Sequence, residues 1–353
     1  MPVTLSSLSD LRTLGFDEVI DVRTPSEYAQ DHLPGAINLP VLDDSERARV
    51  GMIYKQVSPF DARKIGAALV ARNAARHIEQ SLMDRPGGWH PLIYCWRGGQ
   101  RSGSFATILG QIGWRVETIA GGYKAWRRLV IEALHNRPFP APVVLLDGNT
   151  GTAKTELLKL LAGMGVQVLD LEGLANHRGS LFGATGPQPA QTGFEGRLAD
   201  LIERLDPARP VVIEAESSMI GRLKLPGRLW RAMQAAPRIE IHASRDERAR
   251  YLTRAYADMI ADPARLAATV DRLRPYQPAR RIEGWHGMIA AGSFAELAGE
   301  LMEWHYDPGY ARSRARIGAQ ITAMTAASLT PDALPDLAAR IALDVAALGK
   351  NPV

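Results

Sequence analysis

The sequence contains a single cysteine, Cys95, in 353 residues. One thiol excludes an internal disulfide framework and any zinc site built from several cysteines. Long apolar runs are also missing, and no segment reaches the length of a membrane-spanning helix. The first ten residues lack the charged lead and the apolar core of a signal peptide. These absences predict a cytoplasmic protein, without membrane contact, whose thiol stays reduced.

Lysine is scarce too, with seven lysines against 35 arginines and a net charge of +4. Between Arg245 and Arg281 lie nine arginines and only five acidic residues, so this segment carries a net charge equal to that of the whole chain. Two interpretations stay open: the segment binds a polyanion such as nucleic acid, or it is a solvated helix face crossed by ion pairs. The candidate nucleic-acid contacts are Arg272, Arg274, Arg280 and Arg281.

The surroundings of Cys95 indicate a reactive thiol. Leu92–Tyr94 reads as a buried strand, a glycine-rich loop with Arg97 and Arg101 follows Cys95, and a helix is expected from Phe105. Backbone N–H groups at a helix start and two guanidinium groups all favour a thiolate and an anion bound to it. A lone cysteine is otherwise more often a small buried apolar residue; the spacing of five residues between Cys95 and Arg101 favours the reactive interpretation.

Residues 5–135 alternate short strands with helices, which predicts a parallel sheet covered on both faces. These residues resemble a rhodanese domain, through Asp21-Val-Arg23, His32 with Pro34–Asn38, the Cys95 loop and Gly121–Trp126. The loop after Cys95 is one residue longer than in the sulfur-transfer rhodaneses and is similar to the phosphatase-like members of that superfamily. A wider loop suits a phosphate-sized oxyanion.

After a stiff, proline-rich linker at 136–142, an apolar strand from Val143 leads into a P-loop pattern and a helix. The predicted phosphate cradle consists of Gly148, Asn149, Thr150, Gly151, Thr152, Ala153, Lys154 and Thr155. Lys154 supplies charge and the Thr155 hydroxyl is a candidate Mg²⁺ ligand. Ala153 stands where the pattern expects glycine. We assign residues 143–240 to a P-loop-type α/β domain and 241–353 to a helical, arginine-rich C-terminal region packed on it.

Two further segments carry candidate site residues. Val211–Ser217 is an apolar strand ending in acids, and either Glu214 or Glu216 is expected to hold a metal-bound water or act as a base; an ion pair with an arginine is the alternative. The polar loop 170–183 brings His177, Arg178 and Ser180 near the expected phosphate site as substrate contacts. No Asn-Lys-x-Asp motif occurs, which argues against a guanine-nucleotide switch.

The combination of these domains resembles the bacterial tRNA 2-selenouridine synthase family. The resemblance rests on the Cys95 and P-loop segments, Asp21-Val-Arg23, Glu46–Gly51 with Tyr54-Lys55, Gly121–Lys124, Asp170–Ser180 and Glu214–Ser217. It implies that the wobble 2-thiouridine of tRNA is first S-geranylated from geranyl diphosphate. Selenium from selenophosphate then replaces the sulfur, carried on Cys95 as a perselenide while Arg97 and Arg101 bind the phosphate. We expect no tightly bound cofactor, with Mg²⁺ only as a candidate ion at Thr155, and we expect a monomer.

Two alternatives remain. The Cys-x5-Arg loop also suits a phosphatase, although no general acid is identified near it. A redox-sensing nucleotide-binding module would combine an oxidisable Cys95 with a P-loop.

Overall fold

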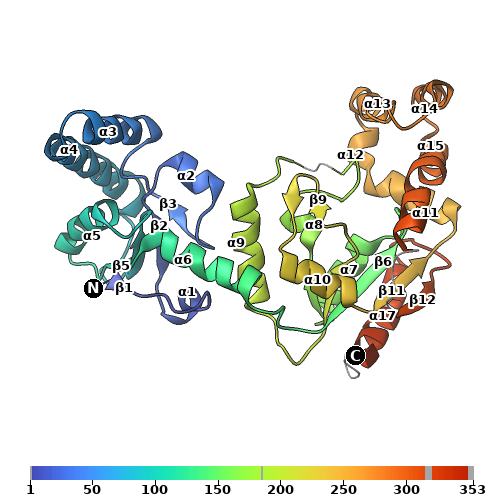
Figure 1. Cartoon of the computed structure of the whole chain (residues 1–353), viewed down its shortest axis with the longest axis horizontal. Helices are drawn as coiled ribbons and strands as arrows, with labels where there is room; N and C mark the ends of the chain where they lie inside the picture. The colour runs from blue at the N-terminus through green and yellow to red at the C-terminus, as the bar shows by residue number, and fades with distance from the viewer. Residues whose placement is uncertain (1, 184–185, 315–319, 349–353) are drawn as a thin grey trace. The chain divides into compact units, whose positions relative to one another are not determined.

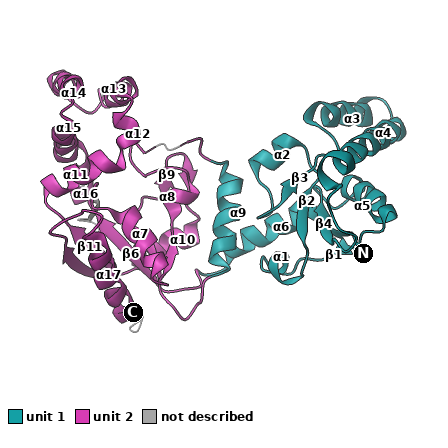
Figure 2. Ribbon diagram, turned by 180° about the vertical axis from the view of Figure 1, so that it is seen from behind, with its two compact units in different colours: residues 1–138, 189–204 teal, residues 139–188, 205–353 magenta. Residues whose placement is uncertain are grey.

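The computed structural model describes residues 2–183, 186–314 and 320–348. The chain forms two compact units, which Figure 2 shows in separate colours: residues 1–138 with 189–204, and residues 139–188 with 205–353. Each unit contains a five-stranded, all-parallel sheet, and the largest insertions are helical (Figure 1). The predicted fold class is confirmed.

The sheet of the first unit has the strand order β1-β5-β4-β2-β3. Its strands are β1 (Pro2–Val3), β2 (Glu18–Asp21), β3 (Ile37–Asn38), β4 (Pro91–Tyr94) and β5 (Glu117–Ile119). Its main helices are α1 (Asp10–Thr13), α2 (Pro25–Gln30), α3 (Asp44–Gln56), α4 (Pro59–His77), α5 (Gln100–Ile112) and α6 (Gly122–Ile131). The predicted start of α2 is confirmed, because Thr24 and Glu27 form a reciprocal capping box. Strand β4 is buried along its length and delivers Cys95 at the carboxyl edge of the sheet.

Helix α9 (Gln191–Ile202) belongs to the first unit, although the sequence-based limits place it in the P-loop domain. It packs on α6, and two glycines allow the close approach. A side chain at Gly196 would meet the Trp126 ring at 2.6 Å, and one at Gly193 would meet the Gln30 carbonyl oxygen at 3.0 Å. Ion pairs of Arg127 with Glu195 and of Arg12 with Asp200 reinforce the contact. The chain therefore passes between the units three times.

The sheet of the second unit has the order β12-β11-β6-β8-β7. Its strands are β6 (Val143–Gly148), β7 (Gln167–Leu169), β8 (Val211–Glu214), β11 (Arg238–His242) and β12 (Ile321–Thr325), and β9 (Met219–Ile220) and β10 (Leu223–Lys224) form a hairpin. The C-terminal region is mainly helical, as expected, but it also contributes strand β12 to the sheet edge.

The helices of the second unit divide into two groups. The first group comprises α7 (Lys154–Gly163), α8 (Leu171–Leu174), α10 (Gly227–Ala235), α11 (Arg245–Ala255), α16 (Asp307–Arg314) and α17 (Leu334–Leu348). Of these, α7 and α10 contact strands of the sheet, and α17 packs on α7. A second group comprises α12 (Ala257–Ile260), α13 (Pro263–Asp271), α14 (Ala279–Ala291) and α15 (Phe294–Leu301). None of the described helices combines the length and apolar content that a membrane-spanning segment needs.

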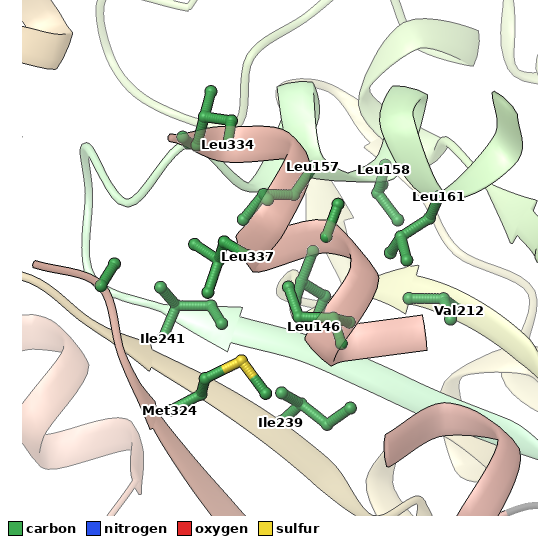
Figure 3. Packing of buried hydrophobic residues seen from close by; sticks show 14 of the residues in the cluster. Leu146, Leu157, Leu158, Leu161, Val212, Ile239, Ile241, Met324, Leu334 and Leu337 are labelled. Atoms are coloured by element: carbon green, nitrogen blue, oxygen red, sulfur yellow. The ribbon is translucent and has the colours of Figure 1, made fainter. Parts of the chain in front are cut away.

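Leucines of α7 and α17 form the main core of the second unit with strands β6, β8, β11 and β12 (Figure 3). Leu146, Val212 and Ile241 come from the sheet, Leu157 from α7 and Leu337 from α17. The second helical group has its own core around Trp285. Burial of this apolar surface fixes the strand β6 and helix α7 on either side of the P-loop.

Candidate functional site

The Cys95 loop is held by the turn between β5 and α6. Tyr123 N–H donates to the Cys95 carbonyl at 2.9 Å, and Lys124 N–H donates to the Trp96 carbonyl at 3.1 Å. A Cβ at Gly122 would lie 2.2 Å from the Cys95 carbonyl oxygen, and one at Gly98 would lie 2.4 Å from that of Ile119. Both glycines also have positive φ. The Gly121–Lys124 motif therefore shapes the thiol loop.

Hydrogen bonds stabilise the thiolate form of Cys95. Its Sγ accepts from the Ser102 hydroxyl at 3.2 Å and from Gly99 N–H at 3.3 Å. Burial raises the pKa of the thiol, but these bonds and the N–H groups of Ser102 and Arg97 outweigh burial, so the pKa lies below its ordinary value. The buried placement of Cys95 is thus compatible with reactivity, since the loop replaces the lost water.

The two arginines of the loop differ in environment. Arg97 is exposed, whereas Arg101 donates to Glu27 at 2.8 and 3.4 Å. Glu27 also caps α2 by accepting from Thr24 N–H at 3.1 Å. The sequence predicts Arg101 as a phosphate ligand, and this stays a prediction; in the structure its charge is balanced by the Glu27 carboxylate. The long-range pair joins residues 74 positions apart, which the loop motif does not reveal.

Cys95 opens onto a pocket of about 810 Å³ between its loop and helices α3 and α4. Arg47 and Lys55 of α3, Arg63 of α4, and the two loop arginines line it, and no described residue of the lining is acidic. The pocket therefore favours an anion through its net positive charge. Sequence reasoning missed these helix contacts; the segment Glu46–Lys55, already singled out for its resemblance, contains two of them.

The P-loop joins β6 to α7 with the backbone shape that its pattern predicts. Gly151 has a φ of 87°, and a Cβ there would meet the Arg248 carbonyl oxygen at 3.0 Å. Ala153 takes the left-handed conformation, with a φ of 60°, at the position where glycine is expected. This conformation costs an L-residue about 1–2 kcal/mol. The buried Ala153 methyl group packs in the main core and offsets part of that cost.

A partly buried ion pair supports the same loop from outside. Arg248 of α11 donates to both Asp307 oxygens, at 2.9 and 2.8 Å, and to the Thr150 carbonyl at 3.2 Å. Asp307 also accepts from the Asn149 side chain at 3.0 Å. Asn149 is thereby directed to Asp307, while the loop backbone lines the neighbouring pocket of about 330 Å³.

Three carboxylates face the start of α7. Glu172, Glu214 and Glu216 each place an oxygen within 4.8 Å of the others, and the Thr155 hydroxyl donates to Glu214 at 3.0 Å. Burial, followed by mutual repulsion, raises the pKa of Glu172; burial also raises the pKa of Glu214 and Glu216, against the attraction of Lys154. The sequence did not distinguish Glu214 from Glu216 as the residue that holds a metal-bound water or acts as a base. The structure brings both side chains together and adds Glu172.

These groups fit a divalent cation. One oxygen of Glu214 is buried without a hydrogen-bond partner among the described residues, and hard oxygen ligands are those that Mg²⁺ prefers. Lys154 Nζ donates to the Gly148 carbonyl at 3.0 Å. Burial lowers the pKa of Lys154, but Tyr310 and the three carboxylates outweigh burial and raise it, so the amine is charged.

The loop at 170–183 is only partly at this site. Arg178 and Ser180 line the P-loop pocket, and Gly179 lies over the carboxylates, where a Cβ would meet Glu172 at 2.3 Å. His177 is absent from the described lining, and burial lowers its pKa. Tyrosines 251, 256, 306 and 310 also line the pocket and were missed, because they follow the P-loop by about a hundred residues or more.

The arginine-rich segment does not form one uniform surface. Arg245, Arg248, Arg250 and Arg274 pair with acidic residues. Arg281 is half-buried and stacks on the Trp304 ring at 4.0 Å. Arg272 and Arg280 are exposed, and the described part of the chain provides no acidic partner for them. The ion-pair interpretation therefore describes the paired arginines, and nucleic-acid binding by Arg272 and Arg280 stays a prediction.

Comparison with known proteins identifies two domains, one for each of the two sites described above. The family model for the tRNA 2-selenouridine synthase AAA domain matches residues 141–273, and the rhodanese-like domain model matches residues 4–129. The tRNA 2-selenouridine synthase of Sulfurovum sp. (strain NBC37-1) is 38% identical over 251 residues, covering 69% of this chain and 68% of the relative. The chain belongs to the tRNA 2-selenouridine synthase family. The resemblance drawn from the sequence is thereby confirmed.

Other family members match to a similar extent. The tRNA 2-selenouridine synthase of Pseudomonas syringae pv. syringae (strain B728a) is 39% identical over 250 residues, covering 68% of this chain and 66% of the relative. That of Shewanella denitrificans (strain OS217) is 36% identical over 262 residues, covering 72% and 68%. The matches with this chain span about two thirds of the length of these relatives.

The contacts of Cys95 lead to a test of the thiolate. Ser102→Ala removes a hydrogen bond to a charged acceptor, worth about 1.5–3 kcal/mol, so the pKa of Cys95 should rise by about one unit or more. The pH dependence of alkylation by iodoacetamide measures this directly, because the chain has no other thiol. Ser104→Ala is the matched control, since Ser104 lines the same pocket but is not among the described donors to Sγ. An unchanged pH midpoint in Ser102→Ala contradicts the assignment.

Proposed function

We propose that the protein replaces sulfur by selenium in the wobble 2-thiouridine of tRNA, in two steps at two sites. The observation that carries this proposal is the pairing of two anion sites in one chain. One holds an activated thiol in a basic pocket, and the other holds a P-loop beside buried carboxylates. Relatives bearing the name tRNA 2-selenouridine synthase support it.

In the first step, the sulfur of 2-thiouridine attacks the first carbon of geranyl diphosphate. A carbon–sulfur bond forms, the carbon–oxygen bond breaks, and diphosphate leaves with the electron pair. Lys154 and the N–H groups of residues 148–155 are suited to stabilise that leaving group. A Mg²⁺ ion, held by Thr155 and the carboxylates, would add positive charge there.

In the second step, selenium displaces the alkylated sulfur, which is a better leaving group than the original thiocarbonyl sulfur. The basic pocket around Cys95 is suited to hold selenophosphate. Arg97 and the cations of α3 and α4 would balance the negative charge of this ligand. The paired Arg101 contributes less to this binding, because Glu27 already neutralises it.

The electron count limits how Cys95 takes part. Thiolate attack on selenium forms the S–Se bond of a perselenide, and the electron pair of the broken Se–P bond then stays on phosphorus, which leaves as phosphite. A second thiol must then form a disulfide with the Cys95 sulfur, so that the S–Se bond breaks and selenium is transferred as selenide. Release of phosphate instead means that water attacks phosphorus and selenium leaves as selenide, with Cys95 unmodified. Phosphorus NMR of the products distinguishes the two routes.

The phosphatase alternative has less support. A phosphatase protonates its leaving group with a general acid, and the described lining of the Cys95 pocket contains no carboxylic acid. Phosphate release from a phosphomonoester in the absence of tRNA would favour it. Tight ATP or GTP binding without turnover of modified tRNA would favour a redox-sensing nucleotide-binding module.

Cys95→Ser tests the division of labour between the sites. It should abolish selenium incorporation and leave geranylation largely intact, because the alkylation step is assigned to the other unit. Mass spectrometry of wobble nucleosides after incubation with each co-substrate measures both products. Full selenation by the variant contradicts the role of the thiol.

Lys154→Ala tests the diphosphate cradle. Loss of a charge-assisted contact of about 1.5–3 kcal/mol should lower the geranylation rate by about one to two orders of magnitude. Lys159→Ala is the control, because Lys159 is an exposed cation on the same helix and pocket rim; its effect should stay below about threefold. Inorganic pyrophosphate should compete with geranyl diphosphate and ATP should compete poorly, whereas strong ATP competition points to an NTPase.

The exposed arginines test tRNA binding. Arg272→Ala with Arg280→Ala should weaken tRNA affinity and reduce its salt slope by about 1–2, because each phosphate contact releases counterions. Arg245→Ala with Arg250→Ala removes the same charge from arginines already paired with Glu303 and Glu247, and should change the slope less. Titrations at two salt concentrations compare the variants; equal slopes for both pairs and the unmodified protein place the tRNA surface elsewhere.

A further inference from the structure

A second, apolar pocket lies beside the P-loop pocket. Its cavity measures about 70 Å³, and its walls are formed mainly by apolar side chains. Phe182 comes from the loop after α8, Met259 from α12, Leu266 from α13, and Phe294, Leu297 and Leu301 from α15. These residues belong to the core of the second helical group or pack against it, and the pocket is a partly open gap at this core.

The two pockets share a wall. Thr150 of the P-loop, Ser180, Leu252, Tyr256 and Tyr306 line both of them. The Ser180 and Tyr256 hydroxyls are 3.1 Å apart and satisfy each other. A ligand with its charged head on the P-loop can therefore extend past these two hydroxyls without unpairing them. The Tyr306 hydroxyl at the same wall is buried and lacks a hydrogen-bond partner among the described residues.

We infer that the apolar pocket holds the hydrocarbon chain of an isoprenoid diphosphate whose diphosphate group lies on the P-loop. This inference rests on the proposed function and assigns residues to it. A nucleoside triphosphate would place a ribose and a base beyond the phosphates, and both need hydrogen-bond partners that an apolar wall does not offer. The small apolar cavity would hold the part of such a chain that enters it, and transfer of that part from water is favourable in proportion to the surface buried.

Ala298 is the residue best placed to limit the chain. It lies in α15, is half-buried, and lines the apolar pocket but not the P-loop pocket. Leucine is a good helix former, so Ala298→Leu fills space in the pocket without removing a core side chain. Ala295 lies on the same helix, is exposed, and is not among the lining residues, which makes Ala295→Leu a matched control.

Calorimetric titration with geranyl diphosphate and with inorganic pyrophosphate, on the full chain and both variants, tests the inference. The unmodified protein should bind geranyl diphosphate at least about 100-fold more tightly than pyrophosphate. Ala298→Leu should lower this advantage at least about tenfold and leave pyrophosphate affinity unchanged, and Ala295→Leu should match the unmodified protein.

The remaining outcomes overturn the inference in distinguishable ways. If the advantage of geranyl diphosphate is the same in Ala298→Leu, the chain binds elsewhere and the proposed function stands. If pyrophosphate and geranyl diphosphate bind the unmodified protein equally, no chain pocket exists, although the diphosphate cradle remains. If neither ligand binds, the diphosphate assignment of the P-loop fails, and the chain pocket fails with it.

Discussion

Close backbone packing at the end of a central parallel strand is the constraint on which both sites depend. In the first unit, a Cβ at Gly122 would lie 2.2 Å from the carbonyl oxygen of Cys95. In the second, a Cβ at Gly148 would lie 2.4 Å from the Thr152 hydroxyl. Without side chains at these points, the loops fold back and turn their N–H groups toward one place. The thiolate and the proposed diphosphate use this same feature.

The electrostatics of the two sites are opposite. The Cys95 pocket is lined by cations and needs only an anion to be balanced. The P-loop pocket holds Lys154 against three carboxylates, two of them buried and one half-buried, whose pKa values are raised. A diphosphate entering it would meet repulsion unless protons or a divalent cation neutralise those groups first. A Mg²⁺ ion held by these residues would balance the charge of the carboxylates, which would then be its ligands.

Local sequence motifs predicted where the two site loops lie in the fold. The strand–loop–helix settings of Cys95 and Lys154 are short-range features, and hydrophobic periodicity with capping residues is enough to find them. The contacts that the motifs do not contain depend on tertiary packing. The pair of Arg101 with Glu27, the attachment of α9 to the first unit through Gly196 and Trp126, and the tyrosines around the P-loop all join residues far apart in sequence. Ala153 shows a further limit: a substituted motif position still adopts the left-handed turn, because the core on either side fixes it.

The second helical group contains proposed contacts for both substrates of the alkylation step, the geranyl chain and the tRNA. Its interior, from Met259 to Leu301, lines the apolar pocket, and its surface carries the exposed Arg272 and Arg280. Phosphates bound by these arginines and a chain bound inside would act on one packed body. Because packed cores resist small deformations, this body would hold the two proposed binding surfaces at a fixed spacing from each other.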